Sequence, residues 1–470
     1  MTWTLDFFKK NRVFSAGVIL LILSITILNN SYFHHDGYVS PDSAEYLAIA
    51  KELKENQSAF YKVNPAIGDE DIFFSTWPLG YPTVIALCSA LTSTSVFVAS
   101  KILNLFVLML FLWLLNYRFK GDAISFYPLL FTGGFIYLLS ATLSELFFCS
   151  ILLGIFILLE KQLYGEYKNK FLYVLCLSTL VLILPLIRYV GIFLFFFLSL
   201  YCLILISKKR YKDFWLHSCS LIIAGAFYTV YLYCNIYYTS EITGISRPFA
   251  LNFYFFEFIK ALFGQIIFIY PGFSLWAIIL QITIIFIWYL TEGKYLPKIS
   301  FGKLSMSTKE SGFLYISAGI LYFLFIFFLG SLSGFKNYNF RFLFPGTSLF
   351  FVGIVINLGY QFMYRMYKLL LVLSFTSISY NSYLLLKTYQ RTRMVYNEKV
   401  DHILGEAEKI PSKSVIIFPP KHLKYLTQNF IFFDGYAQKD ENLFIEEIKN
   451  YYPDYKIFTF KGDNLSKRLK

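Results

Sequence analysis

Runs of about 20 apolar residues recur along this chain between residues 13 and 386. A helix of about that length spans the roughly 30 Å hydrocarbon core of a bilayer. Soluble helices of the same length would need a polar face, and most of these runs have none. Only 15% of the 470 residues are charged and 57% are hydrophobic, which leaves too few charges to cover a soluble globule. We therefore expect an all-α polytopic membrane protein.

Eleven spans are expected, at 13–33, 97–117, 123–139, 143–160, 171–187, 189–207, 214–237, 273–290, 312–330, 342–360 and 367–386. One further apolar segment, 79–91, has only 13 residues. That length is typical of a helix that lies along the membrane surface rather than one that crosses.

Basic residues indicate which loops face the cytoplasm. They form five clusters beside the apolar runs: Arg118/Lys120, Lys161/Lys168/Lys170, Lys208/Lys209/Arg210/Lys212, Lys294/Lys298/Lys303/Lys309 and Arg365/Lys368. If the N-terminus is cytoplasmic and 79–91 does not cross, all five clusters face the cytoplasm, as the positive-inside rule requires. The loops 34–96 and 238–272 and the tail then lie outside. Polar residues gather in loop 34–96, which indicates chemistry at the outer interface rather than transport at mid-membrane.

The net charge of +13 does not indicate a nucleic-acid partner, because the basic residues follow the apolar runs instead of forming one patch. His34, His35 and Asp36 do not indicate a metal site either. Adjacent side chains on an extended segment point opposite ways, and no third histidine is close in sequence. We expect no metal ligand there.

The tail, 387–470, differs in character from the apolar part, 1–386. A helical stretch at 390–409 precedes short apolar runs at 414–418 and 430–433, a second helical stretch at 442–451 and a last run at 456–460. Strands and helices that alternate on this scale predict a small soluble α/β domain on the outer face.

Asp42 stands just after the first span, in Ser40-Pro-Asp-Ser-Ala-Glu-Tyr46. Asp42 as the N-cap of a helix, with Glu45 three residues later, forms a capping-box pattern. A capping carboxylate is also held fixed at the start of the helix, so a structural role and a chemical role are compatible.

A second motif, Trp77-Pro-Leu-Gly-Tyr-Pro82, opens the short apolar segment. Alone, it is a rigid turn with aromatic residues, a common composition at a membrane boundary. Together with Asp42-x-x-x-Tyr46, it resembles the first outer loop of GT-C glycosyltransferases that use polyprenyl-phosphate sugars. That superfamily includes the protein O-mannosyltransferases and the lipid A aminoarabinose transferases. Other segments with matching order and sidedness are Leu143-Ser-Glu145, Arg341-Phe-Leu-Phe-Pro345, Val415-Ile-Ile-Phe418, Lys424-Tyr-Leu-Thr427 and the loop 238–272.

The resemblance implies a GT-C-like fold, with about 11 transmembrane helices, an interfacial first outer loop and the small C-terminal α/β domain. It implies hexosyl or pentosyl transfer from a lipid-linked sugar phosphate to a hydroxyl of a glycan, lipid or protein acceptor. The reaction would take place at the outer, periplasmic face of a bacterial inner membrane. Several relatives carry an acidic pair in the first loop, whereas here Asp42 is followed by Ser43. No cofactor is expected, and the pattern leaves a role for a divalent metal open.

The resemblance also points to site residues. Asp42 is the candidate base for the acceptor hydroxyl, and the candidate substrate-binding residues are Glu45, Tyr46, Trp77, Tyr81, Glu145, Arg188, Arg247 and Arg341. The arginines are candidate contacts of the donor phosphate. Simpler roles stay open: Arg188 and Arg341 as snorkelling charges, Arg247 as a solvated loop charge and Glu145 as a helix N-terminal carboxylate.

Two other functions stay open at this point. A polysaccharide polymerase or ligase that uses a polyprenyl-diphosphate-linked glycan would need arginines in a large outer loop but not Asp42. A transporter or flippase would need broken helices with charges at mid-membrane and two similar halves, and the sequence has neither feature.

Overall fold

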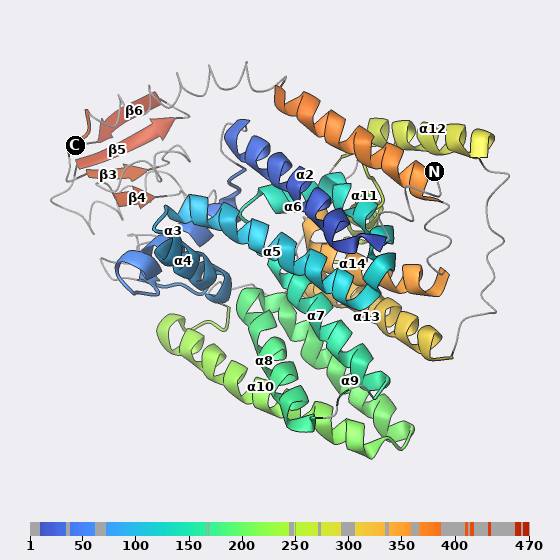
Figure 1. The fold of residues 1–470 in the computed structure, drawn as a ribbon. Coiled ribbons are helices and arrows are strands. Elements are labelled where there is room, and N and C mark those ends of the chain that lie inside the picture. The colour runs from blue at the N-terminus through green and yellow to red at the C-terminus, as the bar shows by residue number, and fades with distance from the viewer. Residues whose placement is uncertain are drawn as a thin grey trace. The chain divides into compact units, whose positions relative to one another are not determined.

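The structure is a computed structural model, and it describes residues 10–33, 38–61, 72–165, 167, 169–243, 249, 251–270, 274–292, 306–333, 338–358, 366–386, 409–411, 414–417, 431–433, 456–461 and 464–469. The chain forms two compact units (Figure 1). The first comprises Met1–Gln57 and Ser75–Leu385, and the second comprises Ser58–Phe74 and Leu386–Lys470.

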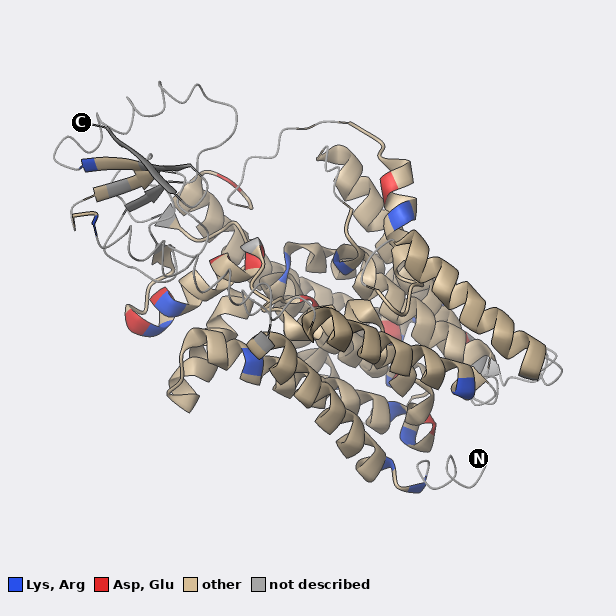
Figure 2. Cartoon of the chain, turned by 90° about the horizontal axis from the view of Figure 1, so that it is seen from above, with Lys and Arg blue, Asp and Glu red and all other residues tan. Residues whose placement is uncertain are grey.

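The first unit is a helical bundle. Its elements are α2 (Arg12–Phe33), α3 (Pro41–Glu55), α4 (Gly80–Thr92), α5 (Val96–Phe119), η2 (Lys120–Ser125), η3 (Tyr127–Phe131), α6 (Gly133–Ser140), α7 (Glu145–Leu163), α8 (Lys170–Ile187), η4 (Tyr189–Ile192), α9 (Phe193–Ser207), α10 (Tyr211–Thr239), α11 (Phe255–Gly264), α12 (Leu275–Glu292), α13 (Met306–Leu332), α14 (Phe340–Leu358) and a last helix, Met366–Leu386. Within the described residues, nine helices are long and apolar enough to cross a membrane. Charged residues gather in short groups along mostly uncharged helices (Figure 2). The chain is a multi-pass membrane protein.

The nine long helices match nine of the expected spans. The expected span 273–290 forms α12, whose 18 residues correspond to about 27 Å, at the lower limit for a crossing. The apolar segment 79–91, which we expect not to cross, forms α4, a helix of 13 residues and about 20 Å.

The expected helical span 123–139 is wrong as a helix. This segment consists of the 3-10 turns η2 and η3 and the eight-residue helix α6. Pro128 is the second residue of η3, and Thr132 caps α6 by accepting a hydrogen bond from the Phe135 N–H, so the helix cannot begin before Gly133.

The segment still travels from one end of α5 to the other. Near its start, the Tyr127 hydroxyl contacts the Asn116 amide, and at its end the Ser140 carbonyl accepts a hydrogen bond from Lys101. Most of the residues between them are buried in the bundle. Irregular backbone at membrane depth is tolerated only where protein surrounds it, and this segment meets that condition.

Helix α7 forms the centre of the bundle. Of its 18-residue apolar window, 72% is buried, a larger share than in the other long helices of the described chain. It packs against α5, α8, α13 and α14. Its first residue, Glu145, therefore lies among several helix ends, and so does Glu160 near its other end.

The second unit contains strands from two parts of the chain. β1 (Phe60–Tyr61) pairs with β2 (Ile72–Phe73) in antiparallel register. A four-stranded sheet has the order β4-β3-β5-β6, from β3 (Ser414–Ile417), β4 (Ile431–Phe433), β5 (Lys456–Lys461) and β6 (Asn464–Leu469). β3 is parallel to β4 and β5, and β6 is antiparallel to β5. β3, β4 and β5 lie where the sequence predicts strands, whereas β6 was not predicted. The predicted helix at 442–451 lies outside the described residues, and so does the predicted helix at 390–409 except for residue 409.

Candidate active site

The start of α3 places Asp42 at one end of the bundle. The N-cap is Ser40, whose Oγ accepts a hydrogen bond from the Ser43 N–H at 3.1 Å. Pro41 follows as the first helical residue, a position that suits its fixed φ. The predicted capping box with Asp42 as N-cap is therefore wrong. Because Ser40 caps the helix, the Asp42 carboxylate in the first turn can pair with a side chain instead.

The start of α7 places Glu145 in the same region. Glu145 is the first residue of the helix and is fully buried, and the N-terminal dipole of α7 favours its negative charge. Ser144 precedes it and makes no capping bond. Its Oγ lies 3.2 Å from the Tyr46 hydroxyl and accepts a hydrogen bond from Arg188 at 3.0 Å. Ser144 thus connects α3, α7 and the end of α8.

Arg188 reaches Glu145 because α8 ends just before it. Arg188 has extended backbone between α8 and η4, and its N–H bonds back to the Leu184 carbonyl. Only glycine fits three residues later, since a Cβ on Gly191 would lie 2.4 Å from the Pro185 nitrogen. The buried guanidinium forms an ion pair with Glu145, Nη1 to Oε1, at 2.8 Å. Burial lowers the pKa of Arg188, but Glu145 together with the weaker effects of Tyr46, Tyr322 and Asp42 raises it, and the net pKa is raised.

Arg341 is the second residue of α14 and contacts both carboxylates. Its Nη2 lies 2.6 Å from Asp42 Oδ2, and its Nε lies 3.8 Å from Glu145 Oε1. Pro345, one turn later, has no N–H to bond the Arg341 carbonyl. The Phe342 ring lies beside both arginines, with its centroid 4.9 Å from the Arg341 Cζ and 5.8 Å from the Arg188 Cζ.

The cluster alternates in charge: Asp42, Arg341, Glu145, Arg188. The side chains of Asp42 and Arg341 are 19% and 15% exposed, whereas those of Glu145 and Arg188 are 0% and 8% exposed. Neither Glu145 oxygen meets the geometric criteria for a hydrogen bond within the described chain, although Oε1 lies in ion-pair range of both arginines. The Glu145–Arg188 pair is therefore fixed by burial, whereas the Asp42–Arg341 pair is accessible to solvent.

Three aromatic residues pack beside this cluster. Tyr46 is buried, with its ring centroid 5.1 Å from that of Tyr81 and 6.1 Å from that of Trp77. Burial raises the pKa values of Tyr46 and Tyr81, so both phenols stay neutral. The Trp77 Nε1 and the Tyr81 hydroxyl are buried and have no hydrogen-bond partner in the part of the chain that the structure describes. Buried polar atoms of this kind call for a partner, which a ligand or water can provide.

The structure thus brings together Asp42, Glu145, Arg188 and Arg341, with Tyr46, Trp77 and Tyr81 beside them. Glu45 is half-buried on α3, and Arg247 lies outside the described residues. Their roles stay predictions, as do those of the other site residues. His34, His35 and Asp36 are also outside the described residues, and in the remainder no group of three His, Cys, Asp or Glu could hold a metal.

Sequence reasoning missed three polar residues at this end. Ser144 is the bridge described above, and Lys101 and Asn104 of α5 are buried and donate to backbone carbonyls of residues 139–141. A lysine and an asparagine in an apolar run were a usable signal, because polar groups at membrane depth need partners.

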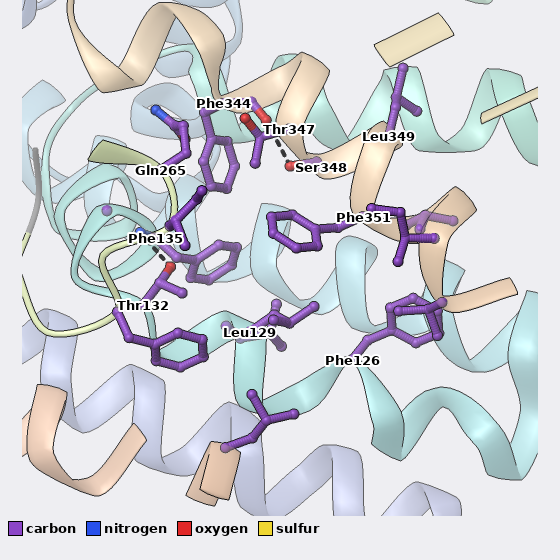
Figure 3. A pocket seen from close by; sticks show the side chains of 18 of the residues that line it. Phe126, Leu129, Thr132, Phe135, Gln265, Phe344, Thr347, Ser348, Leu349 and Phe351 are labelled. Carbon is purple, nitrogen blue, oxygen red and sulfur yellow. Dashed lines mark hydrogen bonds between the residues drawn. The ribbon is translucent and has the colours of Figure 1, made fainter. Parts of the chain in front are cut away.

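An apolar cavity of about 340 Å³ adjoins the cluster. Phe126, which joins η2 to η3, Phe135 of α6, and Phe344 and Phe351 of α14 are among the rings that surround it (Figure 3). Two of its helices also carry the charged cluster. Phe340 lines the cavity next to Arg341 on α14, and Cys149 lines it one turn after Glu145 on α7. Charge and apolar space are therefore adjacent on the same two helices.

Comparisons with known proteins give a similar fold. No family model matches the sequence, and no curated protein matches it. The solved structure of ArnT from Cupriavidus metallidurans bound to undecaprenyl phosphate is similar, with a TM-score of 0.56 over 96% of this chain and 93% of that one, at 10% identity. The same protein in the apo state gives a TM-score of 0.47 with the same coverage and 12% identity. At this identity the likeness shows the fold alone: the chain has a fold similar to that of ArnT.

Proposed function

We propose that this protein is a GT-C type glycosyltransferase of the bacterial inner membrane, with its active site on the outer face. It transfers a hexosyl or pentosyl residue from a polyprenyl-phosphate-linked donor to an acceptor hydroxyl. The observation that carries the proposal is the ion pair between Asp42 and Arg341, 2.6 Å apart and partly exposed, at the edge of a buried Glu145–Arg188 pair. The ArnT structure of similar fold contains undecaprenyl phosphate, which supports a lipid donor of the same class.

The reaction needs a base and a cationic site. The acceptor oxygen forms a bond to the anomeric carbon while the bond from that carbon to the donor phosphate oxygen breaks. The acceptor proton passes to the Asp42 carboxylate, and the electron pair of the broken bond leaves with the polyprenyl phosphate. A guanidinium fork suits the phosphate oxygens, and Arg341 presents one at the exposed edge of the cluster.

Donor binding requires an exchange of partners. The cluster has two carboxylates and two guanidinium groups, so it carries no excess positive charge before the donor arrives. A phosphate that takes Arg341 from Asp42 gains a cation and leaves the carboxylate available to the acceptor. Arg188 stays with Glu145 and holds the inner edge of the site in place.

The apolar cavity suits the donor's isoprenoid chain. Phe340 lines it and is next to Arg341, the proposed phosphate contact. Most of its other lining residues are Phe, Leu, Ile and Val. The Trp77 Nε1 and the Tyr81 hydroxyl are donors that sugar hydroxyls can satisfy. Lipid, phosphate and sugar would thus each meet matching chemistry.

Asp42→Asn tests the base. Mass spectrometry of surface glycans and glycolipids from cells with and without the protein identifies the product, and the variants are then compared by its amount. We expect Asp42→Asn to lower transfer about 10²–10⁴-fold. Asp213→Asn is a matched control, since Asp213 forms an ion pair of 2.8 Å with Arg210 and is similarly exposed. Normal product with Asp42→Asn would contradict the base role and favour a diphosphate-dependent polymerase.

Arg341 variants test the phosphate contact. Binding of undecaprenyl phosphate to the purified protein should weaken with Arg341→Lys, which keeps the charge but loses the fork, and weaken further with Arg341→Ala. Thermal stability is measured on the same samples. If Arg341→Ala lowers stability and leaves lipid binding unchanged, Arg341 only ties α14 to α3 and α7.

A further inference from the structure

One segment, residues 264–268 at the end of α11, joins the wall of the apolar cavity to α14. All five residues of this segment line the cavity, and Gln265 is one of them (Figure 3). α11 packs on α14 and on Tyr338 just before it, whose ring centroid lies 5.3 Å from that of Phe258. The segment therefore lies between the proposed isoprenoid site and the helix that carries Arg341.

Hydrogen bonds fix the segment to two neighbouring helices. The Gln281 amide of α12 donates to the Ile266 carbonyl at 2.9 Å and accepts a hydrogen bond from the Phe268 N–H at 2.7 Å. The Phe268 carbonyl accepts from the Gly133 N–H at the start of α6, also at 2.7 Å. Gln281 and α6 line the cavity as well, so these bonds define one side of the cavity wall.

A further hydrogen bond connects the segment to the charged cluster. The Gln265 Nε2 donates to the Phe340 carbonyl, which belongs to the peptide group that links Phe340 to Arg341. Phe340 lines the cavity and is packed so closely on α6 that a Cβ on Gly134 would lie 3.3 Å from its ring. A displacement of this peptide group would also displace Arg341, whose Nη2 lies 2.6 Å from Asp42.

We propose that Gln265 is a positioning residue that couples the isoprenoid chain of the donor to the contact between Arg341 and the phosphate. A chain in the cavity contacts the segment 264–268 and Phe340 together, and the Gln265 amide holds the peptide group before Arg341 against that wall. Chain and phosphate then stabilise the same arrangement of the site, so each strengthens the binding of the other. The inference rests on the proposed function and adds that the two parts of the donor bind cooperatively.

Lipid binding to the full-length protein in mixed micelles tests this coupling. The probes are undecaprenyl phosphate and geranyl phosphate, which share the phosphate and differ in chain length. Gln265→Met keeps the length of the side chain and removes the donor. It should lower the ratio of the two affinities at least about fivefold, the lower end of typical coupling between two sites. The methionine adds apolar surface to the cavity, so a lower ratio cannot come from lost apolar contact.

Gln162→Met is the matched control. Gln162 donates to the Asp213 carboxylate at 2.9 Å and does not line the cavity, so this variant should leave the ratio unchanged. Gln265→Leu also lacks the donor, and it decides the same question if Gln265→Met does not fold. An unchanged ratio in the folded Gln265 variant would overturn the proposal and leave Gln265 as a structural contact of α14.

A double variant tests whether Gln265 acts through Arg341. Gln265→Met combined with Arg341→Ala should bind undecaprenyl phosphate no more weakly than Arg341→Ala alone, whereas additive losses would overturn the proposal. The proposed function fails in a different way. If Arg341→Ala leaves undecaprenyl phosphate binding unchanged, the phosphate contact is wrong and the coupling is wrong with it. If Arg341→Ala weakens binding and the Gln265 change adds to the loss, only the coupling is rejected.

Discussion

Glu145→Gln is the sharpest test of how the charged cluster is held together. The substitution keeps the shape of the side chain and removes its charge, so Arg188 remains buried without an anion. The Arg188 side chain is 8% exposed and Glu145 is 0% exposed, and their ion pair spans 2.8 Å. Removal of one partner from a buried pair costs about 3–5 kcal/mol, because the remaining charge is left in a medium that solvates it poorly. We expect the free energy of unfolding to fall by that amount.

The measurement is equilibrium unfolding of the purified protein in mixed micelles. Glu257→Gln is the matched control, because its pair with Lys260 is half-exposed at 4.0 Å and should contribute less than about 1 kcal/mol. A double-mutant cycle with Arg188→Met isolates the pair. The double variant should be more stable than the sum of the single losses predicts, by about 1–3 kcal/mol. A loss below 1 kcal/mol for Glu145→Gln, or additive losses, would refute a buried ion pair at this position.

Three further predictions test the frame around the site. Ser40→Ala removes the N-cap of α3 and should lower stability by about 0.5–2 kcal/mol in the same unfolding measurement, whereas an unchanged stability would restore Asp42 as the cap. Gly80→Ala should cost about 1–3 kcal/mol or more, since its Cβ would lie 2.4 Å from the Leu186 carbonyl oxygen; a neutral effect would show that α4 and α8 are further apart. In sealed cells, a cysteine at Ser93 should react with an impermeant outer reagent and one at Lys209 should not, and protection of Ser93 would contradict the eleven-span arrangement.

Much of the bundle could be predicted because apolar length is a local property of the sequence. The nine long helices follow from it directly. The segment 123–139 has the same composition, but Pro128 and the Thr132 cap break it into turns. A buried position in the bundle makes such a break tolerable, and burial depends on neighbours that the sequence does not identify.

Sequence reasoning groups four of the candidate site residues at one membrane face but does not fix how they pair, and their roles stay predictions. Asp42, Glu145, Arg188 and Arg341 all stand at expected outer helix ends, so span counting places them at one membrane face. Which arginine meets which carboxylate depends on helix rotation, and two arrangements with the same charges satisfy the sequence equally. The N-cap of α3 differed for a local reason, because Pro41 at the first helical position moves the cap to Ser40.

Each end of α7 carries a buried glutamate paired with arginine, Glu145 at the start and Glu160 near the end, but the two glutamates differ in how completely their oxygens are hydrogen-bonded. At the far end, the oxygens of Glu160 are satisfied by Arg118, Ser311 and Tyr315, so a new partner would have to displace bonds in a buried network. At the start of α7, Glu145 forms ion pairs, but neither of its oxygens accepts a hydrogen bond from the described residues. The adjoining Arg341 is partly exposed. Exchange of partners therefore costs less at the start of α7, where one guanidinium is already shared between two carboxylates. A site that must bind and release a phosphate in every cycle needs this incomplete arrangement, whereas a helix lock needs the complete one.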